Sequence, residues 1–245
     1  MKFPVLLPNI FNHPFTYESD LKLKTGDYVI VPFGKSKITG VIWDEFEQDN
    51  KKNFKVKKIL KKIRISPLKK DTIKFLNWFS HYNLIPKGMA LKNILLSSNV
   101  VQKITDEKYS DYIAEIRNHS FKLSSEQKKS LKIMNKYNDQ FRVHVLQGTT
   151  GSGKTIVYFE ALKRIINNDL QCLILLPEIG LTGQFEQKFF DFFGFKPAVW
   201  HSGISKKKKE IIWSGVNEEK IKVIIGARSS LFLPFKSLGS VSYTH

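Results

Sequence analysis

One eight-residue segment limits more than any other what this chain can fold into. Gly148 to Thr155 reads GTTGSGKT and matches the phosphate-loop pattern G-x-x-x-x-G-K-[ST] at every fixed position. Its glycines let the backbone curl so that successive N–H groups point at phosphate oxygens, and the following helix adds the positive end of its dipole. In such a loop Lys154 reaches the β- and γ-phosphates, and the Thr155 hydroxyl holds Mg²⁺.

The segments on either side predict the strand–loop–helix unit that this motif requires. Residues 143–146 (VHVL) are typical of a short buried strand, and residues 156–166 (IVYFEALKRII) of an apolar-rich helix. A chance glycine–serine turn is the alternative, and this context argues against it. The predicted nucleotide-binding residues are Gly148, Thr149, Thr150, Gly151, Ser152, Gly153, Lys154 and Thr155, of which Lys154 and Thr155 are the predicted catalytic residues.

From residue 121 onward, strand-like and helix-like segments alternate. Helices are expected at 125–137, 181–193 and 206–214, and strands at 172–176, 196–201 and 221–225. This alternation predicts right-handed crossovers and a parallel sheet. Because the last of these strands is at 221–225, we expect it to lack a neighbour and to leave an exposed edge.

The first 66 residues predict a small β-rich module instead. Tyr28–Val31 and Ile38–Trp43 are rich in β-branched and aromatic residues, and a turn segment joins them. Residues 54–65 (FKVKKILKKIRI) fit either a lysine-bearing edge strand or a basic amphipathic helix. Helices follow at 67–98, and a polar connector comes after them. The expected domains are therefore 1–98 and 121–245, with a linker at 99–120.

The composition narrows the class of protein. The net charge of +18 favours a polyanionic partner, with nucleic acid first, although 35 lysines against 5 arginines also fit an AT-rich genome. No apolar run approaches the length of a membrane helix, so we expect no membrane partner. The single cysteine, Cys172, excludes an internal disulfide and lies in a predicted core strand, which fits a reducing cytoplasm.

Beyond the phosphate loop, three further segments make a resemblance specific. They are LLPEIGLTGQ at 175–184, the pair His201-Ser202, and GARSSLFLPF at 226–235. Together with GTTGSGKTIVY they resemble the first, RecA-like lobe of superfamily 2 DNA helicases, and most closely the PriA family (primosomal protein N′). The resemblance covers most of residues 121–239. It implies ATP and Mg²⁺ as cofactors.

The amino-terminal module resembles the 3′-DNA-end-binding domain of the same family, through FTY at 15–17 and GDYVIVPFG at 26–34. The resemblance implies a pocket for the last nucleotide of the nascent leading strand. Phe15 and Tyr17 could stack on a base, and a lysine could meet phosphate. The implied DNA-end residues are Phe15, Thr16, Tyr17, Gly34, Lys35 and Lys55, although the family often has Asp where Thr16 stands.

The helicase resemblance also implies roles for single residues. Gln127 would contact adenine from the segment before the loop. The residues implied along a single-strand track are Thr182, Gln184, His201, Ser202 and Arg228. The whole family member would be an ATP-dependent 3′→5′ helicase that recognises stalled forks, starts primosome assembly, and works with helicase-loading and single-strand binding proteins at the bacterial nucleoid.

Three departures from the family pattern shape what we expect of this chain. The 22 residues at 99–120 are too few for the family's winged-helix domain. Leu238-Gly239 is followed by SVSYTH instead of the D-E-E-H motif that positions Mg²⁺ and water. The second lobe and the zinc-binding cysteines do not follow either, so zinc is expected only in a further part of such a protein. We therefore expect nucleotide and DNA binding with little hydrolysis.

Two other functions stay open from the sequence. One is a fork-DNA or 3′-end binding module without motor activity, in which the α/β part is structural. The other is a phosphate-loop kinase that acts on a small molecule. Binding to a primed fork that falls steeply with salt would argue against the kinase.

Overall fold

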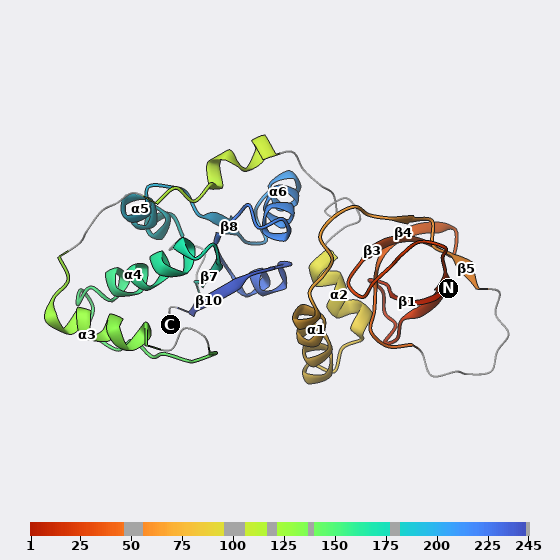
Figure 1. Cartoon of the computed structure of the whole chain (residues 1–245), viewed down its shortest axis with the longest axis horizontal. Coiled ribbons are helices and arrows are strands. Elements are labelled where there is room, and N and C mark those ends of the chain that lie inside the picture. The colour runs from red at the N-terminus through yellow and green to blue at the C-terminus, as the bar shows by residue number, and fades with distance from the viewer. Residues whose placement is uncertain (47–55, 96–105, 117–121, 137–139, 177–181, 244–245) are drawn as a thin grey trace. The chain divides into compact units, whose positions relative to one another are not determined.

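The computed structural model of the chain describes residues 1–46, 56–95, 106–116, 122–136, 140–176 and 182–243 (Figure 1). It divides into two compact units. The first unit contains Met1–Lys108, Ser202–Lys220 and Leu231–Lys236, and the second contains Tyr109–His201, Ile221–Ser230 and Ser237–His245. In the part of the chain that is described, no helix is long and apolar enough to cross a membrane.

A six-stranded sheet organises the first unit. Its order is β5-β2-β1-β4-β3-β6, and all neighbours are antiparallel except the parallel pair β2–β5. The strands are β1 (Lys2–Leu6), β2 (Phe15–Glu18), β3 (Tyr28–Phe33), β4 (Ser36–Ile42), β5 (Lys57–Lys58) and β6 (Lys61–Lys62). Strands β5 and β6 decide between the edge strand and the basic helix that the sequence allowed for residues 54–65. The described part of this segment forms lysine-bearing edge strands and no helix.

The strands of this sheet bury alternate apolar side chains on one face. The main members of that core are Val5, Leu7, Tyr17, Val29, Val31, Ile42 and Ile59. The β3–β4 hairpin pairs Phe33 with Ser36, so only Gly34 and Lys35 form its turn. Gly34 has φ +58°, in the left-handed region that such short hairpin turns favour.

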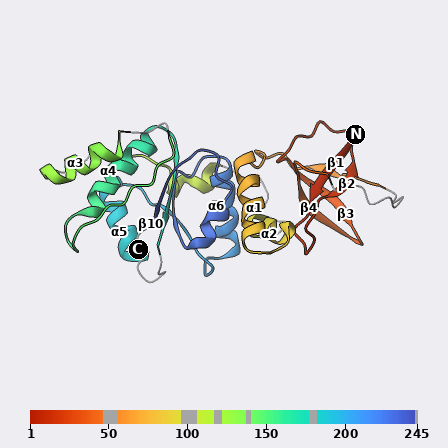
Figure 2. The ribbon, with the colours of Figure 1, turned by 90° about the horizontal axis from the view of Figure 1, so that it is seen from below.

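Three helices among the described residues belong to the first unit, and Figure 2 labels them α1, α2 and α6. They are α1 (Lys70–Tyr82), α2 (Lys87–Leu95) and α6 (Lys206–Asn217). Although α6 comes late in the chain, the indole Nε1 of Trp213 donates to the Ile94 carbonyl oxygen at 2.9 Å. The Trp213 ring also meets the Tyr28 ring edge-on at a centroid distance of 5.8 Å. These buried contacts fix α6 to the amino-terminal sheet and helices.

The second unit contains the predicted parallel sheet, in the order β10-β7-β9-β8. Its strands are β7 (Gln171–Leu175), β8 (Ala198–Trp200), β9 (Val223–Gly226) and β10 (Leu238–Tyr243), and its helices are α3 (Ser125–Met134), α4 (Lys154–Asn167) and α5 (Thr182–Phe193). Two 3₁₀ segments, Asp106–Tyr112 and Arg228–Phe232, complete the described elements. The predicted α/β class, with a β-rich module before a P-loop lobe, is therefore confirmed.

Phenylalanines fill the core between α4, α5 and the sheet. The Phe159 ring of α4 lies 5.7 Å from Phe189 and 5.1 Å from Phe192, centroid to centroid. On the sheet side, Cys172, Leu173 and Ile174 of β7 are fully buried. The expectation that Cys172 is a small core residue is confirmed, and burial raises the pKa of its thiol to about 12.

Two expectations about this sheet are wrong. Residues 143–146 form no strand: Val143 and Val145 are 78% and 88% exposed. Their alternating pattern suits a strand, but a strand also needs a partner, and this segment pairs with none of the described strands. Conversely, Leu238–Tyr243 adds β10 in parallel beside β7, so the sheet does not end with the strand at 221–225.

Lys236 is an unusual buried cation in the first unit. Its ammonium donates to the carbonyl oxygens of Pro67 and, at 3.4 Å, of Ser66. Burial disfavours the charged form and lowers the pKa of Lys236 to about 8, an effect that nearby Glu218 opposes. The folded state therefore releases this proton at a lower pH than the unfolded chain does.

This difference predicts how stability depends on pH. Between about pH 8 and 10.5 the unfolded chain binds more protons at this lysine, so the contribution of Lys236 to the free energy of unfolding should rise with pH there and level off above. In urea unfolding, the free energy of unfolding of the wild type relative to that of Lys236→Met should therefore rise with pH across this range. Exposed Lys37→Met is the control and should keep this rise. An equal pH dependence in all three proteins would contradict the prediction.

Candidate functional site

The phosphate loop forms a tight turn at the start of α4. Gly151 and Gly153 have φ values of +83° and +78°, which only glycine adopts without strain. The Ser152 N–H donates to the Thr149 carbonyl oxygen at 3.2 Å, which closes the turn. Because Gly153 is the N-cap of α4, the loop leads directly into the positive end of a 14-residue helix.

Lys154 lies inside this turn. Its Nζ donates to the carbonyl oxygens of Gly148 at 2.6 Å and Thr149 at 2.7 Å. Both partners are neutral and solvent-exposed, so a phosphate could replace them with a stronger, charge-assisted contact. Thr155 follows as the second residue of α4 and is half-buried. The loop thus offers backbone N–H groups, an ammonium and a hydroxyl at one place, which is the donor set that a nucleotide phosphate requires.

Gln127 connects α3 to this loop. Its backbone N–H donates to the Ser124 hydroxyl at 3.2 Å, and its Oε1 accepts from the Ser124 N–H at 3.0 Å, which is a capping box. The remaining amide Nε2 donates to the Ser152 carbonyl oxygen at 3.2 Å. Gln127 therefore holds the loop against the start of α3, while its contact with adenine stays a prediction. The sequence reasoning did not identify Ser124 as part of this support.

Four of the five residues expected along a single-strand track lie in the second unit. The ends of β8 and β9 are neighbours, since Trp200 pairs with Gly226 and the Ala227 N–H donates to the Trp200 carbonyl oxygen. His201 and the exposed Arg228 follow these two ends. Gln184 is exposed on α5, whereas the side chain of Thr182 lies outside what the structure describes.

Ser202, the last member of that set, belongs to the first unit, where its carbonyl oxygen accepts from Lys209 Nζ at 3.0 Å. The DNA contacts of all five residues stay predictions.

Phe15 is the centre of a group of rings on the sheet of the first unit. Its ring lies 5.3 Å from Phe11, 5.0 Å from His13 and 5.3 Å from Phe33. We call Phe11, His13, Phe15 and Phe33 the aromatic patch. Sequence reasoning identified only Phe15 of these four, although the F-x-H-x-F spacing before β2 was a visible signal.

Tyr17 does not belong to this patch. Its side chain is buried, with 4% exposed, and its hydroxyl donates to the Pro32 carbonyl oxygen at 3.1 Å. Burial also raises the pKa of Tyr17. The expectation that its ring stacks on a base is therefore wrong, because the ring is part of the core. Tyr17 instead supports the turn at the end of β3.

The other expected DNA-end residues lie near that turn or on β2. Lys35 is exposed in the β3–β4 turn, and a side chain at Gly34 would meet nothing within 4 Å, so the turn is open to a ligand. Thr16 is half-buried on β2, where it faces Pro4 of β1. Lys55 lies outside the described residues.

Two family models match the chain in succession. Residues 4–96 match the PriA 3′DNA-binding domain (3′BD), and residues 120–241 match the model described as type III restriction enzyme, res subunit. These matches cover the aromatic patch and the phosphate loop, respectively.

Curated relatives agree with both matches. Proteins called replication restart protein PriA from Rickettsia typhi and Rickettsia felis are 35% and 36% identical to the chain over 242 and 243 residues. The protein of that name from Bacillus subtilis is 37% identical over 103 residues, or 42% of this chain and 13% of its own length. The alignments with the two Rickettsia proteins cover 97% of this chain, which spans only 36% of the length of those relatives.

The loop geometry predicts that replacing Gly153 destabilises the protein. A Cβ there would lie 2.4 Å from Gln127 Nε2, and an L-residue at φ +78° costs roughly 1–2 kcal/mol. Gly153→Ala should therefore lower the free energy of unfolding, measured in urea, by about that amount. Gly183→Ala is the control, because a Cβ at Gly183 meets nothing within 4 Å and its φ is ordinary. Equal stability of both variants would contradict the strained loop.

Proposed function

Because this chain belongs to the PriA family, we propose that it binds ATP–Mg²⁺ at Gly148–Thr155 and the 3′ end of a DNA strand at the aromatic patch. We propose that these two binding activities are part of an ATP-dependent 3′→5′ helicase that recognises stalled forks and initiates primosome assembly. The observation that carries the proposal is that a formed phosphate loop and a ring cluster lie within the two successive family matches.

For the nucleotide, the proposal rests on the position of Lys154. Its ammonium would exchange the carbonyl oxygens of Gly148 and Thr149 for β- and γ-phosphate oxygens when ATP enters. Thr155 would supply the protein hydroxyl to Mg²⁺, and Gln127 would lie next to the base. Hydrolysis by in-line attack of water also needs a group that positions this water.

Strand β10 bears on that last requirement. It ends in Ser242 and Tyr243, which are neutral and cannot hold Mg²⁺ as carboxylates do. We therefore propose that this chain grips nucleotide and hydrolyses little of it by itself.

For DNA, the proposal rests on rings and charge in the same unit. Bases stack on aromatic side chains irrespective of sequence, and lysines neutralise the phosphates between them. We propose that Lys35 at the open turn contacts such a phosphate. Primosome proteins, helicase loaders and single-strand binding protein are the partners that we propose, in the bacterial cytoplasm at the nucleoid.

Removing the loop lysine should separate the two binding activities. In Lys154→Ala, the affinity for a fluorescent ATP analogue should fall roughly 10- to 100-fold, because a charge-assisted hydrogen bond contributes about 1.5–3 kcal/mol. Binding of a DNA with a free 3′-hydroxyl end, measured by fluorescence anisotropy, should be unchanged. The exposed Lys196→Ala is the matched control and should keep both activities. Unchanged ATP affinity in Lys154→Ala would refute the nucleotide site.

ATPase measurements decide between a motor and a binding module. The purified 245-residue chain should bind the ATP analogue but release phosphate at close to the background rate, with or without forked DNA. Robust DNA-stimulated release would contradict our assignment and place the water-positioning group elsewhere in this chain. If the wild type binds DNA 3′ ends but does not bind the ATP analogue, the alternative is favoured, namely a DNA-end module with a structural α/β part.

A further inference from the structure

The rings of the aromatic patch face more than one direction. The planes of Phe11 and Phe15 are perpendicular, at 90°, with centroids 5.3 Å apart. One flat base cannot stack on two perpendicular rings, so a base on Phe15 leaves the face of Phe11 to another ligand. The Phe11 side chain is 39% exposed, which makes its ring accessible. The patch therefore has room to engage two bases.

The loop that carries Phe11 is fixed to the start of α2. The Phe11 carbonyl oxygen accepts from the Gly88 N–H at 3.1 Å, and Asn12 Oδ1 accepts from the Lys87 N–H at 3.1 Å. A Cβ on Gly88 would lie 2.5 Å from the Asn9 carbonyl oxygen, so only glycine allows this approach. The backbone that carries Phe11 is thus held in place before any ligand arrives, so little backbone entropy is lost on binding.

Next to Phe11, Asn12 lines a cavity of about 430 Å³ between this loop and the turn that joins α1 to α2. Asn77, His81 and Lys87 supply further polar groups to its wall, while Ile85 and Pro86 supply apolar surface. Amide, imidazole and ammonium groups together are suited to a sugar-phosphate.

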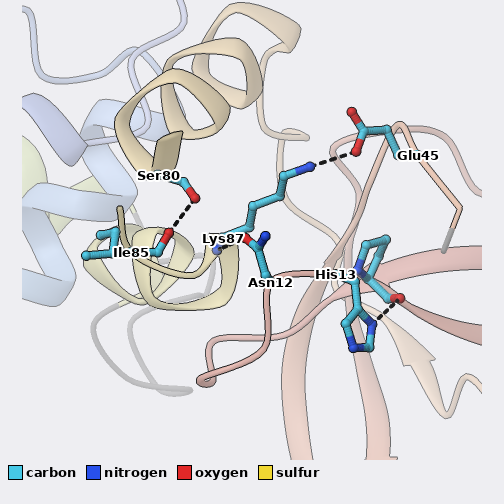
Figure 3. A network of polar contacts seen from close by, with 7 residues as sticks. Asn12, His13, Glu45, Ser80, Ile85 and Lys87 are labelled. Carbon is cyan, nitrogen blue, oxygen red and sulfur yellow. Dashed lines mark hydrogen bonds and ion pairs between the residues drawn. The ribbon is translucent and has the colours of Figure 1, made fainter. Parts of the chain in front are cut away.

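Lys87 is the cation of this cavity, and Figure 3 shows it reaching from α2 toward Glu45. Its Nζ donates to Glu45 Oε2 at 2.7 Å, and the Glu45 side chain is 55% exposed. Such surface ion pairs contribute less than about 1 kcal/mol, so a phosphate can replace Glu45 as the partner of Lys87. The cavity can therefore accept an anion without leaving a buried charge unpaired.

From these contacts we propose a second nucleotide subsite for the nucleotide that precedes the 3′-terminal one. Its base stacks on Phe11, and its sugar-phosphate enters the cavity, where Lys87 and Asn12 bind it. The 3′-terminal base stacks on Phe15. This inference rests on the proposed function of the first unit as a binder of DNA 3′ ends, and it makes the ligand a dinucleotide end.

Oligonucleotides with a single abasic position test the subsite on the full chain. The ligands are a short single strand with a free 3′-hydroxyl, the same strand with a 3′-phosphate, and strands that lack the terminal or the penultimate base. Binding is measured by fluorescence anisotropy with a 5′ label. In the wild type, loss of the penultimate base should weaken binding about fivefold or more, since stacking on an aromatic ring contributes about 1–3 kcal/mol per base.

The variants assign that loss to Phe11. Phe11→Ala should bind the intact strand as weakly as the wild type binds the strand without its penultimate base, and removing this base should cost the variant nothing more. Phe46→Ala is the control, because Phe46 is 57% exposed and outside the patch, and it should behave as the wild type does. Phe11→Leu keeps the apolar volume without the ring and serves if Phe11→Ala fails to fold.

A methylphosphonate at the penultimate linkage tests the cavity in the same way. This neutral linkage should weaken wild-type binding but leave Lys87→Met unaffected, with the exposed Lys92→Met as the control. A wild type that is indifferent to the penultimate base, or a Phe11→Ala variant as sensitive as the wild type, would overturn the subsite. If the wild type does not prefer the 3′-hydroxyl to the 3′-phosphate, the proposed 3′-end function itself fails.

Discussion

The burial of Phe159 among the phenylalanines of α5 is the interaction on which the nucleotide site depends. This residue lies in α4, the helix that begins at the phosphate loop, and its ring contacts Phe185, Phe189 and Phe193. Truncating such a side chain in a core costs about 3–5 kcal/mol. The packing holds α4 against the sheet core, so the loop keeps its place although the residues before it form no strand. At the loop itself, Gln127 adds a second support from α3.

Packing does not follow chain order in this molecule. Helix α6 and residues 231–236 lie within residues 120–241, which match the second family model, yet they pack in the first unit. Trp213 bonds to Ile94, and Phe232 contacts the rings of Phe75 and Phe79 on α1. A core built from such distant segments cannot form until most of the chain is present, which raises contact order and slows folding.

Local patterns predicted the parts of the structure that local forces decide. The glycines and lysine of the phosphate loop, the apolar stripe of α4 and the buried run of β7 all carry their own signal. The strand prediction for residues 143–146 was wrong because their pattern indicates only that a strand is possible. Whether a strand forms depends on a pairing partner far away in the sequence. The stacking prediction for Tyr17 failed for a related reason. Phe15 and Tyr17 are two positions apart on β2, so strand alternation puts both rings on the same face. Tyr17 lies in the core on that face while Phe15 packs against the core and stays partly exposed, a difference that depends on the surrounding fold.

The site residues likewise divide into those that a local motif predicts and those that only the fold brings together. Lys154 could be placed inside its loop from the motif alone, but the carbonyl oxygens that hold it could not. Phe11 and Lys87 lie 76 positions apart, and the loop that carries Phe11 reaches the start of α2 only because Gly88 allows the close approach. Their spacing in the sequence does not predict that these segments lie close together, because this depends on the fold of the whole first unit.

The burial of Cys172 also has a practical consequence. It is the only cysteine of the chain, it is fully buried in β7, and its raised pKa keeps the thiol protonated at neutral pH. Thiolate is the form that alkylates, so the native protein should be inert to maleimides. A cysteine introduced at any exposed position would then be the sole reactive thiol, and a spectroscopic label could be attached there without altering the native sequence elsewhere.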